Sequence, residues 1–137
     1  MNRVHHLTFV VRDLEASLAR FCRDFGVEAV HREELSDRGV FTARFLIGDL
    51  WFVLAQPFRD GVPMQHLREH GEGLLLVSFQ TPDFDSVLAD FAARGVRARG
   101  APRKGIGNWQ VVDLESAAVP GSVAQLCSDT ELSNVPG

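Results

Sequence analysis

The sequence lacks an apolar segment near the ~18 residues that a helix needs to cross a bilayer. It has two cysteines, too few for a disulfide scaffold, and its first residues lack the apolar core of a signal peptide. Positive charge is scarce too, with 14 Lys+Arg against 18 Asp+Glu and a net charge of −4. We therefore expect a cytoplasmic protein that binds neither membranes nor nucleic acid, because nucleic-acid binders need clustered positive charge.

The composition is that of one globular domain. The chain has 137 residues, of which 45% are hydrophobic, enough to bury a core. We expect this domain to span residues 1–128, followed by a flexible polar tail at 129–137. A small molecule is the expected partner.

A segment near the start of the chain returns in the second half. The residues from His6 to Asp13 are matched by those from Leu76 to Asp83, 70 positions later, which indicates an internal duplication. In both copies an aspartate at the N-cap position precedes a helical apolar stripe, which begins at Leu14 in the first copy and at Phe84 in the second. Each half is predicted to contain one strand, one helix and three further strands, in that order.

Further strands are predicted after each helix. The first repeat covers about 3–57, the second about 74–128, and a connector at 58–73 has room for one short helix after Pro63. The predicted strands after the two repeat helices are Ala29–Arg32, Val40–Ile47, Trp51–Ala55, Val96–Arg99, Trp109–Val112 and Val123–Cys127.

The duplicated unit resembles the vicinal oxygen chelate superfamily, also called the glyoxalase/bleomycin resistance/dioxygenase superfamily. The resemblance rests on His-His-Leu-Thr-Phe-Val-Val-Arg-Asp-Leu-Glu-Ala at 5–16 and Gly-Leu-Leu-Leu-Val-Ser-Phe at 73–79, and is closest to the methylmalonyl-CoA epimerase branch. It implies an α+β fold in which two tandem βαβββ repeats form curled mixed sheets around a cavity. It also implies a homodimer.

In that branch four side chains on the first and last strands of each repeat bind a divalent metal. In this sequence the matching positions hold His6, Val53, Leu76 and Gln125. Because Val53 and Leu76 are hydrocarbons, no metal or other cofactor is expected to bind tightly. A weak divalent ion at His6 and Gln125 stays open.

Strand alternation predicts the cavity lining. It points His6 inward and keeps His5 on the other side, since a one-residue slip would turn Leu7 and Phe9 into the cavity. We expect His6 and Gln125 to be catalytic, with His6 transferring a proton and Gln125 donating a hydrogen bond to a substrate oxygen. The expected substrate-binding residues are Thr8, Trp51, Val53, Leu76, Ser78 and Trp109.

Other segments favour plainer interpretations. His66, Glu69 and His70 match the inverted zinc-protease pattern, but the short helix favours an exposed polar surface. The basic segment 102–108 is interpreted as a turn outside the ligand site, and Asp113 and Glu115 as solvated loop residues. The cysteines Cys22 and Cys127 are interpreted as small core residues.

Two function classes follow. The first is an isomerase or lyase-type enzyme that acts on a small carbonyl compound or thioester without a tightly bound metal. The alternative is a metal-free binding protein of the bleomycin-resistance type, which would stack an aromatic or cationic ligand on Trp51 and Trp109.

Overall fold

The computed structural model of the chain describes residues 1–129. Their strands form one nine-stranded mixed sheet in the order β2-β3-β4-β1-β5-β9-β8-β6, with β7 paired to β8. The strands are β1 Arg3–Val10, β2 His31–Leu35, β3 Val40–Ile47, β4 Leu50–Pro57, β5 Gly73–Gln80, β6 Arg97–Ala98, β7 Arg103–Lys104, β8 Gln110–Glu115 and β9 Val123–Ser128. The helices are α1 Leu14–Phe25, α2 Val62–His70 and α3 Phe84–Ala93. Among these residues, no helix has the length and apolarity needed to cross a membrane.

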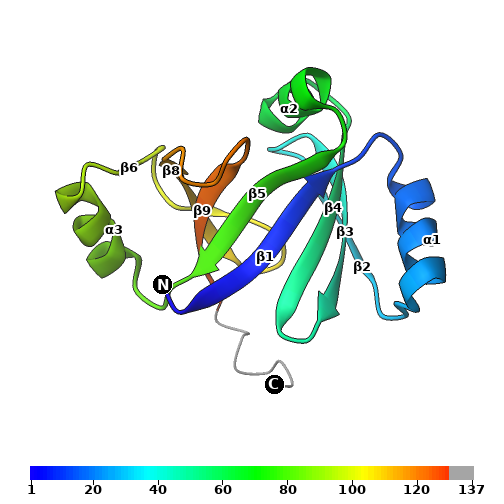
Figure 1. The fold of residues 1–137 in the computed structure, drawn as a ribbon, viewed down its shortest axis with the longest axis horizontal. Helices are drawn as coiled ribbons and strands as arrows, with labels where there is room; N and C mark the ends of the chain where they lie inside the picture. Colours follow the sequence, from blue (N-terminus) through cyan, green and yellow to red (C-terminus); the bar gives the residue numbers. More distant parts are fainter. Residues whose placement is uncertain (130–137) are drawn as a thin grey trace.

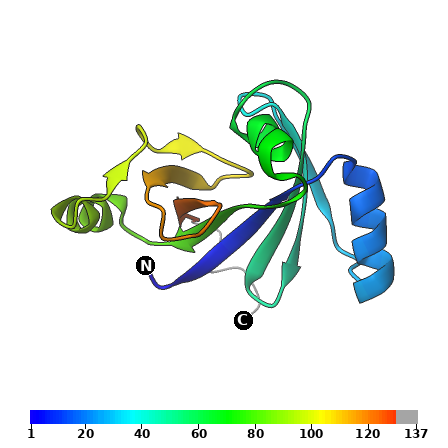
Figure 2. The ribbon, with the colours of Figure 1, turned by 45° about the horizontal axis from the view of Figure 1, so that its top comes forward.

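The two repeats are joined at the middle of the sheet, where β1 pairs antiparallel with β5. Each of these strands also pairs in parallel with the last strand of its own repeat, β1 with β4 and β5 with β9. The sheet curls about this junction, with α1 and α3 at its two sides and α2 above one end (Figures 1 and 2). The predicted α+β fold of two tandem repeats is confirmed.

The repeat helices begin where the sequence places them. Asp13 caps α1 by accepting a hydrogen bond from the amide of Ala16 at 3.0 Å, and Asp83 caps α3 by accepting one from Ser86 at 3.2 Å. Gly26 ends α1 in the left-handed region at φ +70°. The apolar stripe of each helix packs on the outer side of its own half of the sheet.

Some strand limits differ from the predicted ones. β2 runs from His31 to Leu35, later than the predicted 29–32, because its pairing with β3 closes through the turn that ends at Gly39. β1 covers Arg3–Val10, whereas the alternation of apolar residues predicts a strand at His6–Val11. The second repeat contains a further two-residue strand, β7, which pairs with β8.

Candidate functional site

A cavity of about 70 Å³ lies on the inner side of the curled sheet. Six of the eight predicted site residues line it, namely His6, Thr8, Val53, Leu76, Trp109 and Gln125. Apolar side chains from β2, β3 and α2 complete much of the wall, among them Leu35, Val40 and Pro63. Strand alternation thus brings residues of both repeats to one concave surface.

Trp51 and Ser78 lie outside this lining. The ring of Trp51 meets that of Trp109 at 5.9 Å, and the guanidinium of Arg44 lies over it at 5.3 Å. Ser78 is fully buried, and its hydroxyl lies beside the thiol of Cys127. Ser78 therefore belongs to the packed interior behind the cavity, whereas Trp51 is only half-buried and borders a surface groove with His31 and Phe52.

His5 is also buried on the inner side, which corrects the sequence-based expectation. The pairing of β1 with β5 shifts register between Val4 and His6, so simple alternation fails there. His5 is 0% exposed and shares a 2.8 Å contact between its Nδ1 and Nδ1 of His6. Its Nε2 lies 2.8 Å from a carboxylate oxygen of Asp129.

Asp129 is part of the folded core. The sequence predicts a flexible tail from this position, but the Asp129 side chain is buried beside His5. Residues 130–137 of the predicted tail lie outside the described residues.

The carboxylate of Asp113 orients the side-chain amide of Gln125. Asp113 is paired with Gln125 in the β8–β9 register, and its carboxylate accepts a 2.9 Å hydrogen bond from Nε2 of Gln125. This bond uses one of the two hydrogens of the amide nitrogen, so the role of Gln125 as a donor to substrate stays a prediction. Its Oε1 is buried without a hydrogen-bond partner among residues 1–129, and the side chain of Gln125 lies beside His6.

Asp113 and the basic segment also differ from their interpretations. Asp113 is a largely buried strand residue, with its carboxylate 3.4 Å from Arg103 and 3.9 Å from Arg38. Arg38, Arg103 and Lys104 all line the cavity, so part of the segment 102–108 contributes to the cavity wall. Burial is the main cause that lowers the pKa of Arg38, and Arg103 lowers it further while Asp113 raises it.

Glu33 ties the loop before β8 to the first repeat. Its carboxylate accepts a hydrogen bond from the amide of Gly107 at 3.0 Å and lies 3.4 Å from Nη1 of Arg44. The Arg44 guanidinium lies over both Trp51 and Trp109. These contacts hold the loop before β8 against β2 and β3 of the first repeat.

The sequence of this chain matches a known family over most of its length. The family described as the Glyoxalase/Bleomycin resistance protein/Dioxygenase superfamily matches residues 5–112. The chain belongs to this superfamily.

Two solved structures resemble this chain in fold, and one further relative resembles it in sequence. A variant of Streptomyces coelicolor methylmalonyl-CoA epimerase in complex with 2-nitronate-propionyl-CoA has a TM-score of 0.86 at 27% identity, covering 95% of this chain and 96% of that one. The Mycobacterium tuberculosis epimerase has a TM-score of 0.86 at 20% identity, covering 96% and 91%. The 4-hydroxyphenylpyruvate dioxygenase of Xenopus tropicalis is 33% identical over 92% of this chain, which spans only 31% of that relative.

Only two of the four side chains at the superfamily's metal-binding positions carry atoms that can bind a metal. Of the four positions implied by the resemblance, His6 and Gln125 offer donor atoms to the cavity, while Val53 and Leu76 offer none. Because divalent ions in proteins need several nitrogen, oxygen or sulfur donors, these residues do not fit a tight metal site.

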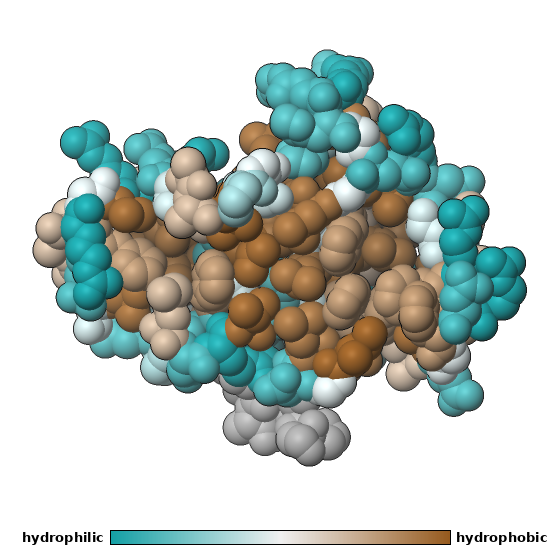
Figure 3. All heavy atoms as spheres, in the orientation of Figure 1, coloured by the Kyte–Doolittle hydropathy of each residue, from teal (hydrophilic) through white to brown (hydrophobic). Residues whose placement is uncertain are grey.

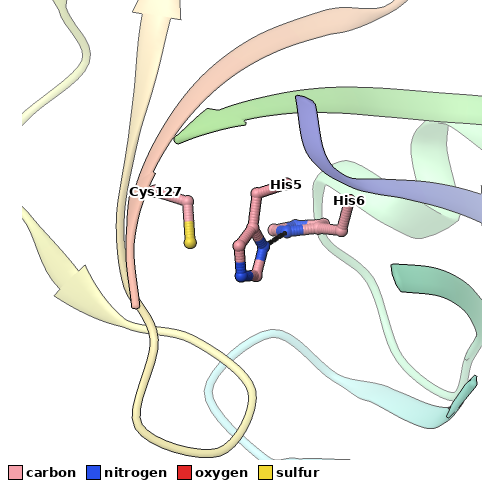
Figure 4. A group of neighbouring side chains, drawn as sticks. All are labelled: His5, His6 and Cys127. Carbon is pink, nitrogen blue, oxygen red and sulfur yellow. Dashed lines mark hydrogen bonds between the residues drawn. The ribbon is translucent and has the colours of Figure 1, made fainter. Parts of the chain in front are cut away.

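A second group with metal-binding chemistry lies behind the cavity. The side chains of His5, His6 and Cys127 place possible ligand atoms within 4.8 Å of one another, and Figure 4 shows His5 beside the other two. Both nitrogens of His5 already take part in hydrogen bonds. Burial raises the pKa of the Cys127 thiol to about 12, so the thiolate that a metal needs is disfavoured. We interpret this group as a polar part of the core.

The helix pattern at His66, Glu69 and His70 stays on the surface. The rings of His66 and His70 are 4.6 Å apart on α2, a helix of nine residues. Among the described residues, this trio does not form a cluster of three close ligand atoms. The interpretation as an exposed polar surface is kept.

Acid is expected to destabilise the fold through the paired histidines. Burial lowers the pKa of His6 well below 6.5 and also lowers that of His5, although Asp129 partly opposes the shift in His5. The unfolded chain therefore takes up protons first, so stability is full above pH 6.5 and falls as the pH drops from 6.5 toward the folded pKa values. Each histidine contributes up to about 1.4 kcal/mol per pH unit.

Urea unfolding at pH 7.5, 6.5 and 5.5 measures this loss. A variant with His66→Gln and His70→Gln is the control, and we expect it to keep the same pH dependence. A wild-type stability that is flat over this range would contradict the expected neutral, buried histidine pair.

Proposed function

We propose that the chain is an enzyme of the epimerase type that moves a proton at the carbon beside the carbonyl of a small thioester or carbonyl compound, without a tightly bound metal. The observation that carries this proposal is the meeting of a buried imidazole, His6, and cationic side chains in one apolar cavity. Such a combination supplies a proton acceptor and a site for developing negative charge.

His6 is the proton-transfer group of the proposed reaction. It is the one imidazole or carboxylate among the described residues that line the cavity. Its Nδ1 is engaged with His5, which leaves Nε2 for the substrate. The lowered pKa of His6 keeps the imidazole neutral at pH 7, the form that accepts a proton.

Arg38, Arg103 and Lys104 hold the negative charge of the substrate. Removing a proton beside a carbonyl places negative charge on oxygen, and fixed cations in a buried site stabilise it. The cationic side chains of the described lining are these three, and the carboxylate of Asp113 contacts the two arginines from outside the lining. A substrate with a carboxylate or thioester oxygen at this end is therefore favoured.

The relatives of known structure support this chemistry. Solved neighbours at 27% identity are methylmalonyl-CoA epimerases, one of them in complex with methylmalonyl-CoA and ammonium. We therefore choose methylmalonyl-CoA as the first probe. In deuterium oxide, with a chelator present, we expect mass spectrometry to show deuterium entering its α-carbon. No incorporation above the buffer rate, with or without Co²⁺, would remove the epimerase proposal.

The second candidate function is a metal-free small-molecule binding protein. It is favoured by the presence of a single imidazole or carboxylate in the described lining, since exchange on both faces of a carbon is easier with two such groups. Trp109 offers little free surface for stacking, because His6 stacks on it at 4.6 Å and Arg44 lies over its ring. A ligand that shifts the melting temperature without exchange or turnover supports this candidate.

Restoring the missing donors is expected to create a metal site. We expect the untagged wild-type protein to hold well under one divalent ion per chain by elemental analysis. The variant with Val53→Gln and Leu76→His is expected to bind Co²⁺ more tightly by about tenfold for each donor, roughly 1.4 kcal/mol each, by equilibrium dialysis. Conversion of Val10→Thr, on the same inner side, is the control. About one ion per chain in the wild type would contradict the argument.

A second copy of the chain is the proposed protein partner. Figure 3 shows hydrophobic side chains spread over the middle of the sheet, where β1, β4 and β5 lie. Leu7, Phe9, Val77 and Phe79 of β1 and β5 are only half-buried and alternate with the inward-facing residues. An apolar face of this kind is typical of an interface.

Sedimentation velocity tests the dimer. We expect the wild type to sediment as a dimer and Val77→Lys to sediment as a monomer, because an ammonium would be buried in the interface. Ala19→Lys, on the exposed side of α1, is expected to stay dimeric. A monomeric wild type at micromolar concentration would overturn this proposal.

For the compartment we propose the cytoplasm, in keeping with the free thiols of Cys22 and Cys127.

A further inference from the structure

Three buried side chains form a continuous hydrogen-bonded series behind the cavity. Asp129 lies 2.8 Å from Nε2 of His5, and Nδ1 of His5 lies 2.8 Å from Nδ1 of His6. All three residues are at most 6% exposed. The series begins on the segment after β9 and ends at the cavity wall.

The directions of these hydrogen bonds follow from the chemistry of the groups. A carboxylate only accepts, so the proton between Asp129 and His5 sits on Nε2 of His5. A neutral His5 then has a bare Nδ1, which must accept from Nδ1–H of His6. That leaves Nε2 of His6 without a proton, on the side of Gln125 and the cavity.

We propose that His5 and Asp129 are positioning residues that hold His6 in the tautomer with a bare Nε2 facing the cavity. This inference rests on the proposed function for its catalytic meaning, because only the bare nitrogen can take a proton from a substrate carbon. The opposite tautomer would present an N–H group and block that step. His5 and Asp129 themselves contact no substrate.

Nitrogen-15 NMR of the histidine rings at pH 7.5 tests the inference directly. In the wild type we expect Nδ1 of His6 to have a pyrrole-type shift and Nε2 an imine-type shift. In Asp129→Asn the new amide can donate to His5, so His5 and then His6 exchange their tautomers in part of the population. Asp49→Asn, an acid-to-amide change at an exposed site, is the matched control and is expected to keep the wild-type shifts.

Variants at His5 give a second, independent readout. His5→Gln keeps an acceptor for Nδ1–H of His6 and is expected to preserve its tautomer, whereas His5→Phe removes the acceptor and mixes the two forms. A pyrrole-type Nε2 in the wild type, or unchanged shifts in folded Asp129→Asn and His5→Phe, would overturn the inference. If the wild-type protein has the expected nitrogen-15 shifts but shows no deuterium exchange, the epimerase proposal is wrong and the positioning roles of His5 and Asp129 still hold.

Discussion

Replacing Leu76 by tryptophan is expected to abolish ligand binding and turnover. Leu76 lines the cavity from β5 at the junction of the two repeats, and the cavity is only about 70 Å³. An indole at this position occupies the space that a ligand needs. The strand is expected to survive because the larger side chain points toward free volume, with an overpacking cost of about 1–3 kcal/mol.

A thermal-shift screen of small organic acids and thioesters measures this effect. Compounds that raise the melting temperature of the wild type are expected to give no shift with Leu76→Trp. His70→Ala, on the exposed end of α2, is expected to respond like the wild type. If His70→Ala lost binding and Leu76→Trp kept it, the ligand site would lie on the connector and not in the cavity.

Replacing His6 by glutamine is expected to slow α-proton exchange by about 10²–10⁴-fold, the usual contribution of one general base. Glutamine keeps a polar side chain of similar length but cannot take up a proton near neutral pH. The rate of deuterium incorporation into methylmalonyl-CoA is the measurement. The control is His70→Gln, the same change of residue type at an exposed site on α2, which is expected to keep the wild-type rate.

A rate for His6→Gln within threefold of the wild type would exclude His6 as the base. Circular dichroism and the melting temperature of each variant show whether a lost rate reflects chemistry or unfolding.

Periodicity and duplication were enough to predict the fold. The helical stripe after Asp13 and the matching stripe after Asp83 fix two equivalent helices, and alternation in β1 separates the helix-packing residues from the cavity residues. The same alternation places His6, Thr8 and Gln125 in the lining. These features depend on local sequence, which is why the sequence alone carries them.

The remaining features of the site depend on contacts between distant segments. The inward orientation of His5 results from a register shift between β1 and β5, and no pattern in the sequence of β1 predicts this shift. The amide orientation of Gln125 is set by its cross-strand neighbour Asp113. Arg38 reaches the cavity from the β2–β3 turn, a place where an exposed arginine is the ordinary expectation.

The pairing registers relate the two repeats by an approximate twofold symmetry with chemically unequal halves. Thr8 pairs with Val53 in the first repeat as Ser78 pairs with Gln125 in the second, so Val53 and Gln125 are equivalent positions. His6 is likewise equivalent to Leu76. His6 and Gln125 thus each have a hydrocarbon at the symmetry-related position. A ligand that could enter a symmetric cavity in two orientations therefore has only one orientation that reaches both polar groups.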